Sequence, residues 1–134
     1  MGIEAKRLDN KGFIIRYTDI LNGSDLISHM EQAYSNPDLL RDSDFGLNDF
    51  SNVVKLNITS DQIAEIARLN RKIHRDHDSR FRIVIYSPAE LFSFMSKLWK
   101  DYLGSAGSSV FHTKSLDEAS SWLSNELGRD IILA

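Results

Sequence analysis

A run of basic side chains at residues 68–82 is the strongest charge feature of the sequence, and its chemistry would be anion binding. The run holds six arginines and lysines and two aspartates, a net charge of +4, whereas the whole 134-residue chain carries −3. Arg71, Lys72 and Arg75 lie within about one turn of the helix predicted there, so they could contact lipid headgroups or a phosphorylated ligand. The alternative is a solvated helix face whose cations suit the C-terminal end of the helix dipole.

Two histidines in the same run raise the question of a metal site. His74 and His77 are three residues apart and would share one face of a helix, and Asp78 could join them. Both histidines, however, fall on the same side as the apolar residues Ile63 and Ile66. We therefore predict histidines at a helix end beside the core, and no metal site.

Hydroxyl side chains occur where three helices are predicted to begin, at residues 59–62, 87–90 and 115–118. Each stretch fits the capping box, in which a hydroxyl and a carboxylate or amide satisfy free backbone N–H groups reciprocally. The sequence has no nucleophile elbow, phosphate-binding loop, dinucleotide fingerprint or zinc-protease helix. It therefore predicts no catalytic residues and no cofactor, and a protein that is not an enzyme.

The helix predicted over residues 88–103 carries more large apolar side chains than a sheet-packed helix needs. At about 100° per residue they cover roughly 180°, whereas one buried face requires about 100° or somewhat more. A cavity, a second subunit or a membrane surface could cover the surplus, and the alternative is a neighbouring helix or the C-terminal segment. The residues expected to contact a ligand or form an interface are Phe92, Phe94, Met95, Trp99 and Leu103.

The elements that position these residues alternate along the chain. Two strands flank a polar turn at 9–12, and the remaining order is helix 25–34, strands 45–50 and 53–58, a helix from 59, strand 81–86, helix 88–103, strand 109–113 and a helix from 115. Residues 130–134 are expected to form an edge strand or a docking segment. This order predicts an α/β fold with a mixed sheet, in which an N-terminal antiparallel hairpin precedes alternating helices and parallel strands. A single domain, 1–134, is expected.

Composition excludes several classes of function. The chain has no cysteine, so it has neither disulfides nor thiolate metal sites, and this fits a reducing compartment. A pI of about 5.8 argues against nucleic-acid binding by the whole surface. The N-terminus lacks the apolar core of a signal peptide, and no apolar run approaches the ~20 residues that span a bilayer. A cytoplasmic protein is expected, with peripheral membrane contact as an option.

Several short stretches carry a family resemblance: Ser35-Asn36-Pro37-Asp38, Leu47-Asn48-Asp49-Phe50 followed by Val53, Leu56-Asn57-Ile58-Thr59, Arg82-Ile83-Val84-Ile85, Val110-Phe111-His112-Thr113 and Glu118-Ala119-Ser120-Ser121-Trp122-Leu123. With these stretches the chain resembles the SpoIIAA-like family, whose fold is related to STAS domains and is compared with the Sec14/CRAL-TRIO lipid-binding fold. The resemblance implies a STAS-like fold. It also implies a phosphorylated serine at the start of the helix after the third strand. That position falls on Ile58 here, and Thr59 or Ser60 could take the role.

Together these features predict a non-enzymatic SpoIIAA-like domain that binds an apolar or amphipathic small molecule, with the 88–103 helix as the mobile or interfacial element. The alternative is a protein–protein interaction regulator of the anti-sigma-factor-antagonist kind, or a homodimer that uses the same helix. An enzyme is the least favoured class, because no set of residues supports a mechanism.

Co-sedimentation with neutral and anionic liposomes tests the membrane prediction. The wild-type protein is expected to sediment with liposomes. The double variant Phe92→Ala, Trp99→Ala is expected to bind less, because each large aromatic side chain buried in the interface contributes about 2–3 kcal/mol. Absence of wild-type binding, or undiminished binding by the double variant, would contradict peripheral membrane contact through this helix.

Overall fold

The computed structural model describes residues 3–9, 11–76, 80–87 and 110–133, and within them five strands form one sheet in the order β1-β2-β3-β4-β5. The strands are β1 (Ile3–Leu8), β2 (Gly12–Asn22), β3 (Phe45–Asn57), β4 (Arg82–Tyr86) and β5 (Val110–Thr113). β1 pairs antiparallel with β2, and every other neighbouring pair is parallel. The predicted mixed sheet, a hairpin followed by parallel strands, is confirmed.

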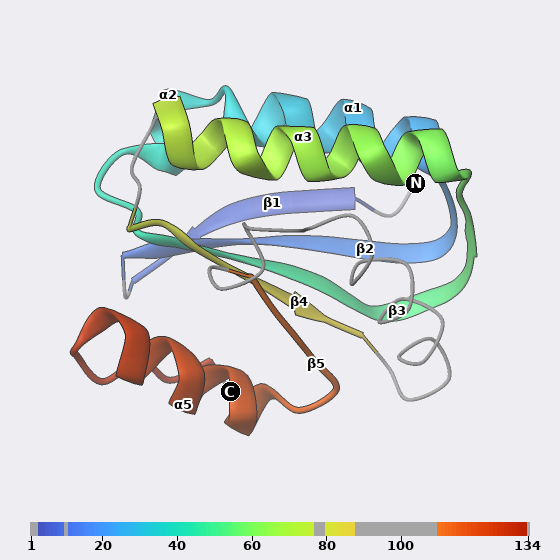
Figure 1. Ribbon diagram of the computed structural model, residues 1–134. Coiled ribbons are helices and arrows are strands. Elements are labelled where there is room, and N and C mark those ends of the chain that lie inside the picture. The colour runs from blue at the N-terminus through green and yellow to red at the C-terminus, as the bar shows by residue number, and fades with distance from the viewer. Residues whose placement is uncertain (1–2, 10, 77–79, 88–109, 134) are drawn as a thin grey trace.

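Helices cover both faces of this sheet (Figure 1). α1 (Gly23–Tyr34), the short α2 (Pro37–Leu40) and α3 (Ser60–Asp76) lie on one face, and α5 (Leu116–Leu127) lies on the other. α1 connects β2 to β3, and α3 connects β3 to β4, so both crossovers move the same way across the sheet. Because such crossovers are right-handed, both helices lie on the same face. Among the helices in the described ranges, none combines the length and the hydropathy that a membrane crossing requires.

The core divides into two layers, one on each face of the sheet. Along β4, Ile83 and Ile85 pack against the α1 and α3 side, and Val84 packs against the α5 side. This strand is therefore covered on both faces, as its continuous apolar sequence predicts. Along β2, Phe13 and Ile15 face the α1 and α3 side and Ile14 faces the α5 side, so successive side chains alternate between the two layers.

Two glycines let β2 and β3 pair closely around aromatic rings. Gly12 is paired with Phe45, and Phe13 is paired with Gly46. A Cβ on Gly12 would lie 2.3 Å from Phe45 Cζ, and a Cβ on Gly46 would lie 2.8 Å from Phe13 Cζ. Each ring therefore occupies the space that a side chain on the neighbouring strand would need, and no larger residue fits without displacing a buried ring.

The structure corrects the predicted boundaries around β3. Residues 45–50 and 53–58 were expected to be separate strands, but β3 runs continuously from Phe45 to Asn57. The polar residues between them form a β-bulge, at which the pairing of β3 with β2 shifts register between Arg16 and Thr18. The strand therefore continues through them. The Asp49 carboxylate accepts a hydrogen bond from Ser51 N at 2.8 Å, which stabilises the bulge.

The structure also defines two segments outside the sheet, the stretch after Pro37 and the C-terminal tail. Residues after Pro37 were expected to form a loop, but they form the single turn of α2, whose N–H of Asp38 donates to Asn36 Oδ1 at 2.9 Å. At the C-terminus, Ile131 is buried beside α5, and its N–H donates to Ser124 Oγ at 2.8 Å. The tail is therefore a docking segment, one of the two forms expected, and it is not a strand.

Replacement of Gly46 by alanine is expected to lower the free energy of unfolding by about 1–3 kcal/mol, because the added methyl group overpacks the buried Phe13 ring. Urea denaturation followed by circular dichroism measures the change. The matched control is Asn52→Ala on the exposed side of the same strand, which is expected to change stability by no more than about 0.5 kcal/mol. Equal stability of the two variants would show that the close approach is not a constraint.

Candidate functional site

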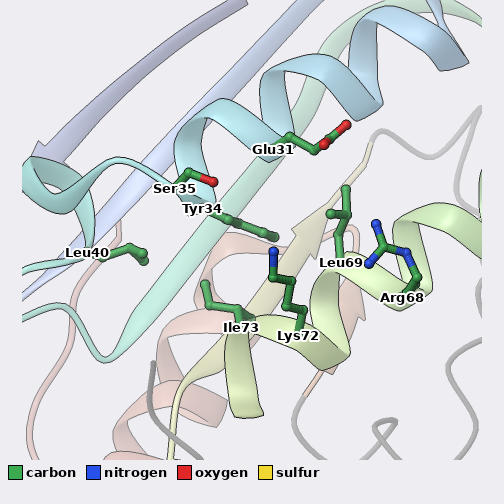
Figure 2. A pocket seen from close by; sticks show the side chains of 8 residues that line it. All are labelled: Glu31, Tyr34, Ser35, Leu40, Arg68, Leu69, Lys72 and Ile73. Atoms are coloured by element: carbon green, nitrogen blue, oxygen red, sulfur yellow. The ribbon is translucent and has the colours of Figure 1, made fainter. Parts of the chain in front are cut away.

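A groove with a volume of about 240 Å³ lies between α1 and α3 (Figure 2). We call it the α1–α3 groove, and it is lined by Glu31, Tyr34, Ser35, Leu40, Arg68, Leu69, Lys72 and Ile73. The last four residues repeat at helical spacing along α3, so a single face of that helix supplies one wall. The other wall is the C-terminal half of α1 together with α2.

The groove combines an apolar floor with cationic side chains. Leu69 and Ile73 are buried in the core beneath it, and Lys72 reaches from α3 across the groove toward Tyr34 (Figure 2). The Arg68 guanidinium is held by a hydrogen bond from Nε to Glu65 Oε1 at 2.9 Å. Lys72, in contrast, has no ion-pair partner among the residues that the structure describes. Among the side chains that the structure describes, Lys72 therefore supplies the positive charge of the groove that no carboxylate pairs with.

A chain of buried polar side chains fixes the inner wall of the groove. Tyr34 Oη donates to Asn70 Oδ1 at 3.2 Å, which links α1 to α3, and Tyr17 Oη donates to Asn48 Oδ1 at 3.1 Å, which links β2 to β3. Burial raises the pKa of Tyr34 to about 12, and the side chain of Asn48 opposes that rise. Burial also raises the pKa of Tyr17. Both phenols therefore stay protonated donors at physiological pH.

The start of α3 forms a second polar feature, at the opposite end of the helix layer from α2. Thr59 and Gln62 make the predicted capping box in full: Gln62 N donates to Thr59 Oγ1 at 3.2 Å, and Thr59 N donates to Gln62 Oε1 at 2.9 Å. The next residue, Ser60, is exposed. A Cβ on Gly23 would lie 2.0 Å from Gln62 Oε1, so the start of α1 lies directly beside the start of α3.

The other capping motifs differ from the prediction. At α5 the hydroxyl half is present, since Glu118 N donates to Ser115 Oγ at 3.2 Å. The Glu118 carboxylate, however, accepts from Thr113 Oγ1 at 3.3 Å, and the N–H of Ser115 also bonds Thr113. In a full capping box the Glu118 carboxylate would accept from Ser115 N. Here the hydroxyl of Thr113, on β5, accepts from Ser115 N in its place. The motif at 87–90 extends beyond the described residues.

A serine and a histidine meet where β4 ends. Ser87 is fully buried, and its Oγ lies 2.6 Å from Nε2 of His112 on β5. Burial lowers the pKa of His112 to about 4. The imidazole is therefore neutral at pH 7, and such a low pKa makes it a weak general base.

The residues predicted from sequence are distributed unevenly over these features. Lys72 lines the α1–α3 groove, whereas Arg71 and Arg75 are exposed on α3 and are not among the lining residues. The hydroxyl and the N–H of Thr59 form the hydrogen bonds of the capping box, whereas Ser60 takes no part in it. All five predicted ligand or interface residues, Phe92, Phe94, Met95, Trp99 and Leu103, lie outside the described residues, so their contact with a ligand, a membrane or a second subunit stays a prediction.

The basic run also raised the question of a metal site. His77 and Asp78 also lie outside the described residues, and no cluster of three or more metal-ligand side chains occurs within the described ranges. Glu31, Tyr34 and Leu40 were not predicted as site residues, because nothing in the sequence indicates that the end of α1 and the middle of α3 meet. The four-residue spacing of Arg68 and Lys72, and of Leu69 and Ile73, is a signal that could have indicated the other wall.

Comparison with solved structures identifies the fold of this chain. No family model and no curated protein sequence matches this chain. The solved structure of the anti-sigma factor antagonist SpoIIAA in its unphosphorylated form superposes with a TM-score of 0.56 over 90% of this chain and 94% of that chain, at 10% sequence identity. The chain has a SpoIIAA-like fold. This confirms the expected fold class and the structural side of the resemblance.

Two more solved structures are similar. The phosphorylated form of SpoIIAA, the Bacillus cell fate determinant, gives a TM-score of 0.55 at 12% identity over 88% of this chain and 96% of that one. An uncharacterised protein from Shewanella loihica with a SpoIIAA-like fold gives 0.49 at 15% identity over 91% and 92%. At such low identity, the likeness to SpoIIAA establishes the fold alone.

The buried imidazole predicts a pH dependence of stability. The folded pKa of about 4 is below the ordinary value of 6.5, so between these values the unfolded state binds the additional proton. The free energy of unfolding is therefore expected to fall as the pH drops from about 6.5 toward 4. In His112→Gln, which keeps a polar group near Ser87 but does not titrate, this part of the pH dependence should disappear.

Denaturation between pH 4 and 7.5 measures the slope, and an NMR titration of the His112 ring protons measures the pKa directly. Identical slopes for wild type and His112→Gln, or a His112 pKa near 6.5, would contradict the burial effect.

Proposed function

We propose that this protein is a non-enzymatic regulatory domain that acts by binding a protein partner, in the manner of an anti-sigma-factor antagonist, and that the start of α3 is its switch. The fold supports this proposal, because the similar structures are those of SpoIIAA, an anti-sigma factor antagonist solved both unphosphorylated and phosphorylated. The observation that carries it for this chain is the exposed Ser60 at the first position of the helix that follows the third strand.

The local geometry favours Ser60 over its neighbours as phosphoacceptor. Ile58, the position that the family pattern indicates, has no hydroxyl and packs partly buried against the core. The Thr59 hydroxyl accepts the hydrogen bond of Gln62 N, so its modification would break the helix cap. Ser60 is exposed, and its modification would leave both hydrogen bonds of the capping box in place.

The surroundings suit a phosphate at Ser60. The starts of α1 and α3 lie together, so two helix dipoles present their positive ends at the same place. A phosphoserine adds a charge of about −1.5 to −2 at pH 7 and three strong acceptor oxygens. Added beside the acidic Asp61 in the first turn of α3, this charge would change the electrostatic complementarity of the surface to a partner.

A second candidate function is the binding of an apolar or amphipathic small ligand. The α1–α3 groove is the observation that favours it, since it joins an apolar floor to a lysine without an ion-pair partner among the described residues. This candidate does not compete with the first, because the groove and Ser60 are at different places along α3.

Phosphopeptide mapping of the protein purified from its native cells, and binding to an anti-sigma factor of the same cells, test the switch. Phosphate is expected on Ser60. Ser60→Asp is expected to weaken partner binding at least tenfold by calorimetry, because it places a permanent negative charge in the interface, and Ser60→Ala is expected to retain binding.

Two controls sharpen this experiment. Ser121→Asp, exposed on α5 at the opposite face of the sheet, should leave affinity unchanged. Thr59→Ala should instead lower stability by about 1 kcal/mol through loss of the helix cap. Partner binding that is equal for wild type and Ser60→Asp, or phosphate found only at another residue, would overturn the proposal.

A further inference from the structure

We propose that the α1–α3 groove is a binding site for a small organic anion with an apolar body, such as an aromatic or branched aliphatic carboxylate, and that Lys72 pairs with the anionic group. This inference rests on the second candidate function, ligand binding in the α1–α3 groove, to which it assigns a chemical class of ligand, and it is independent of the Ser60 switch.

The size of the groove sets the scale of the ligand. A cavity of 150 Å³ lined by apolar residues holds benzene. At about 240 Å³, the α1–α3 groove therefore has room for one ring and a short side chain. The floor offers Leu69, Ile73 and Leu40 to the apolar body.

The Tyr34 side chain restricts what the ligand can be. Its hydroxyl already donates to Asn70 inside the protein, and a pKa of about 12 keeps it protonated. The groove therefore receives mainly the aromatic ring of Tyr34, which favours contact with another ring or a branched aliphatic group.

The charges define the polar end of the ligand. Arg68 is engaged by Glu65 on its own helix and also interacts electrostatically with Glu31 across the groove. Glu31 itself projects away from Lys72 in Figure 2. Lys72 extends over the apolar floor, so an anion beside it would receive the one lining charge that no described carboxylate compensates. Ser35, on the α1 side, can supply a neutral hydroxyl to the same anion.

The test compares three probes of nearly equal shape: 3-phenylpropionate, neutral 3-phenylpropanol and cationic 3-phenylpropylamine. Titrations of the full chain are followed by ¹⁵N amide NMR. With the wild-type protein, 3-phenylpropionate is expected to shift signals from residues 31–40 and 68–73 and to bind at least tenfold more tightly than the alcohol. Absence of shifts in these two segments, or equal binding of acid and alcohol, would overturn the proposal.

Variants at residue 72 separate a binding role from a structural one. Lys72→Gln should remove the preference for the acid over the alcohol, and Lys72→Glu should reverse it, so that the amine binds more tightly than the acid. The matched control Lys55→Gln, at an exposed lysine of β3, should keep the wild-type order. If Lys72 only covers the apolar floor, the order of the three probes will be the same in all variants, and the assignment of the anion site to Lys72 is then wrong.

Discussion

The hydrogen bonding of Asn48 is the constraint on which the arrangement of sheet and helices depends. Asn48 is fully buried in the middle of the central strand β3, where an unpaired amide would cost several kilocalories per mole. Its carbonyl oxygen accepts a hydrogen bond from the hydroxyl of Tyr17 at 3.1 Å, which ties β3 to β2. Its Nδ2 makes no hydrogen bond to the described residues, but the side chain lies close enough to Tyr34 on α1 to lower the pKa of that phenol. Tyr34 in turn donates to Asn70, so a second hydrogen bond joins α1 to α3. Apolar packing alone would allow these helices to slide, whereas the polar contacts are directional.

The same contacts shape the α1–α3 groove. Tyr34 is held by its hydroxyl, and its ring also makes an edge-on contact with Phe13, with ring centroids 6.2 Å apart. The ring is thus fixed, and the groove between the end of α1 and α3 lies above Leu69 and Ile73. The groove thus lies beside the Tyr34–Asn70 hydrogen bond, and its floor belongs to the hydrophobic core.

α3 connects the two candidate sites within one rigid element. Ser60 begins the helix and Lys72 lies twelve residues later, which is about 18 Å along the axis. Each feature uses a different property of the helix. The start offers free N–H groups and the positive end of the dipole, and the middle offers a side-chain surface that alternates apolar and basic residues. One helix can therefore serve a charge-based switch and a ligand groove without overlap.

Local patterns in the sequence determined the element types and several of their ends. Hydrophobic periodicity predicted α1, α3 and β4, and the spacing of Thr59 and Gln62 predicted the capping box, because these features depend on contacts within a few residues. The basic run on α3 was likewise visible, together with Lys72. Local rules did not show that β3 continues across Ser51 and Asn52, since the bulge that permits this belongs to the pairing with β2.

Only the tertiary structure decided which of these residues share a site. Tyr34 and Lys72 are thirty-eight positions apart, and they meet because two right-handed crossovers place α1 and α3 side by side. Arg71 and Lys72 are neighbours in the chain, yet only Lys72 lines the groove, since successive residues on a helix point about 100° apart. Thr59 and Ser60 are equivalent as hydroxyls in the sequence. They differ in the structure because only Thr59 is tied into the helix cap.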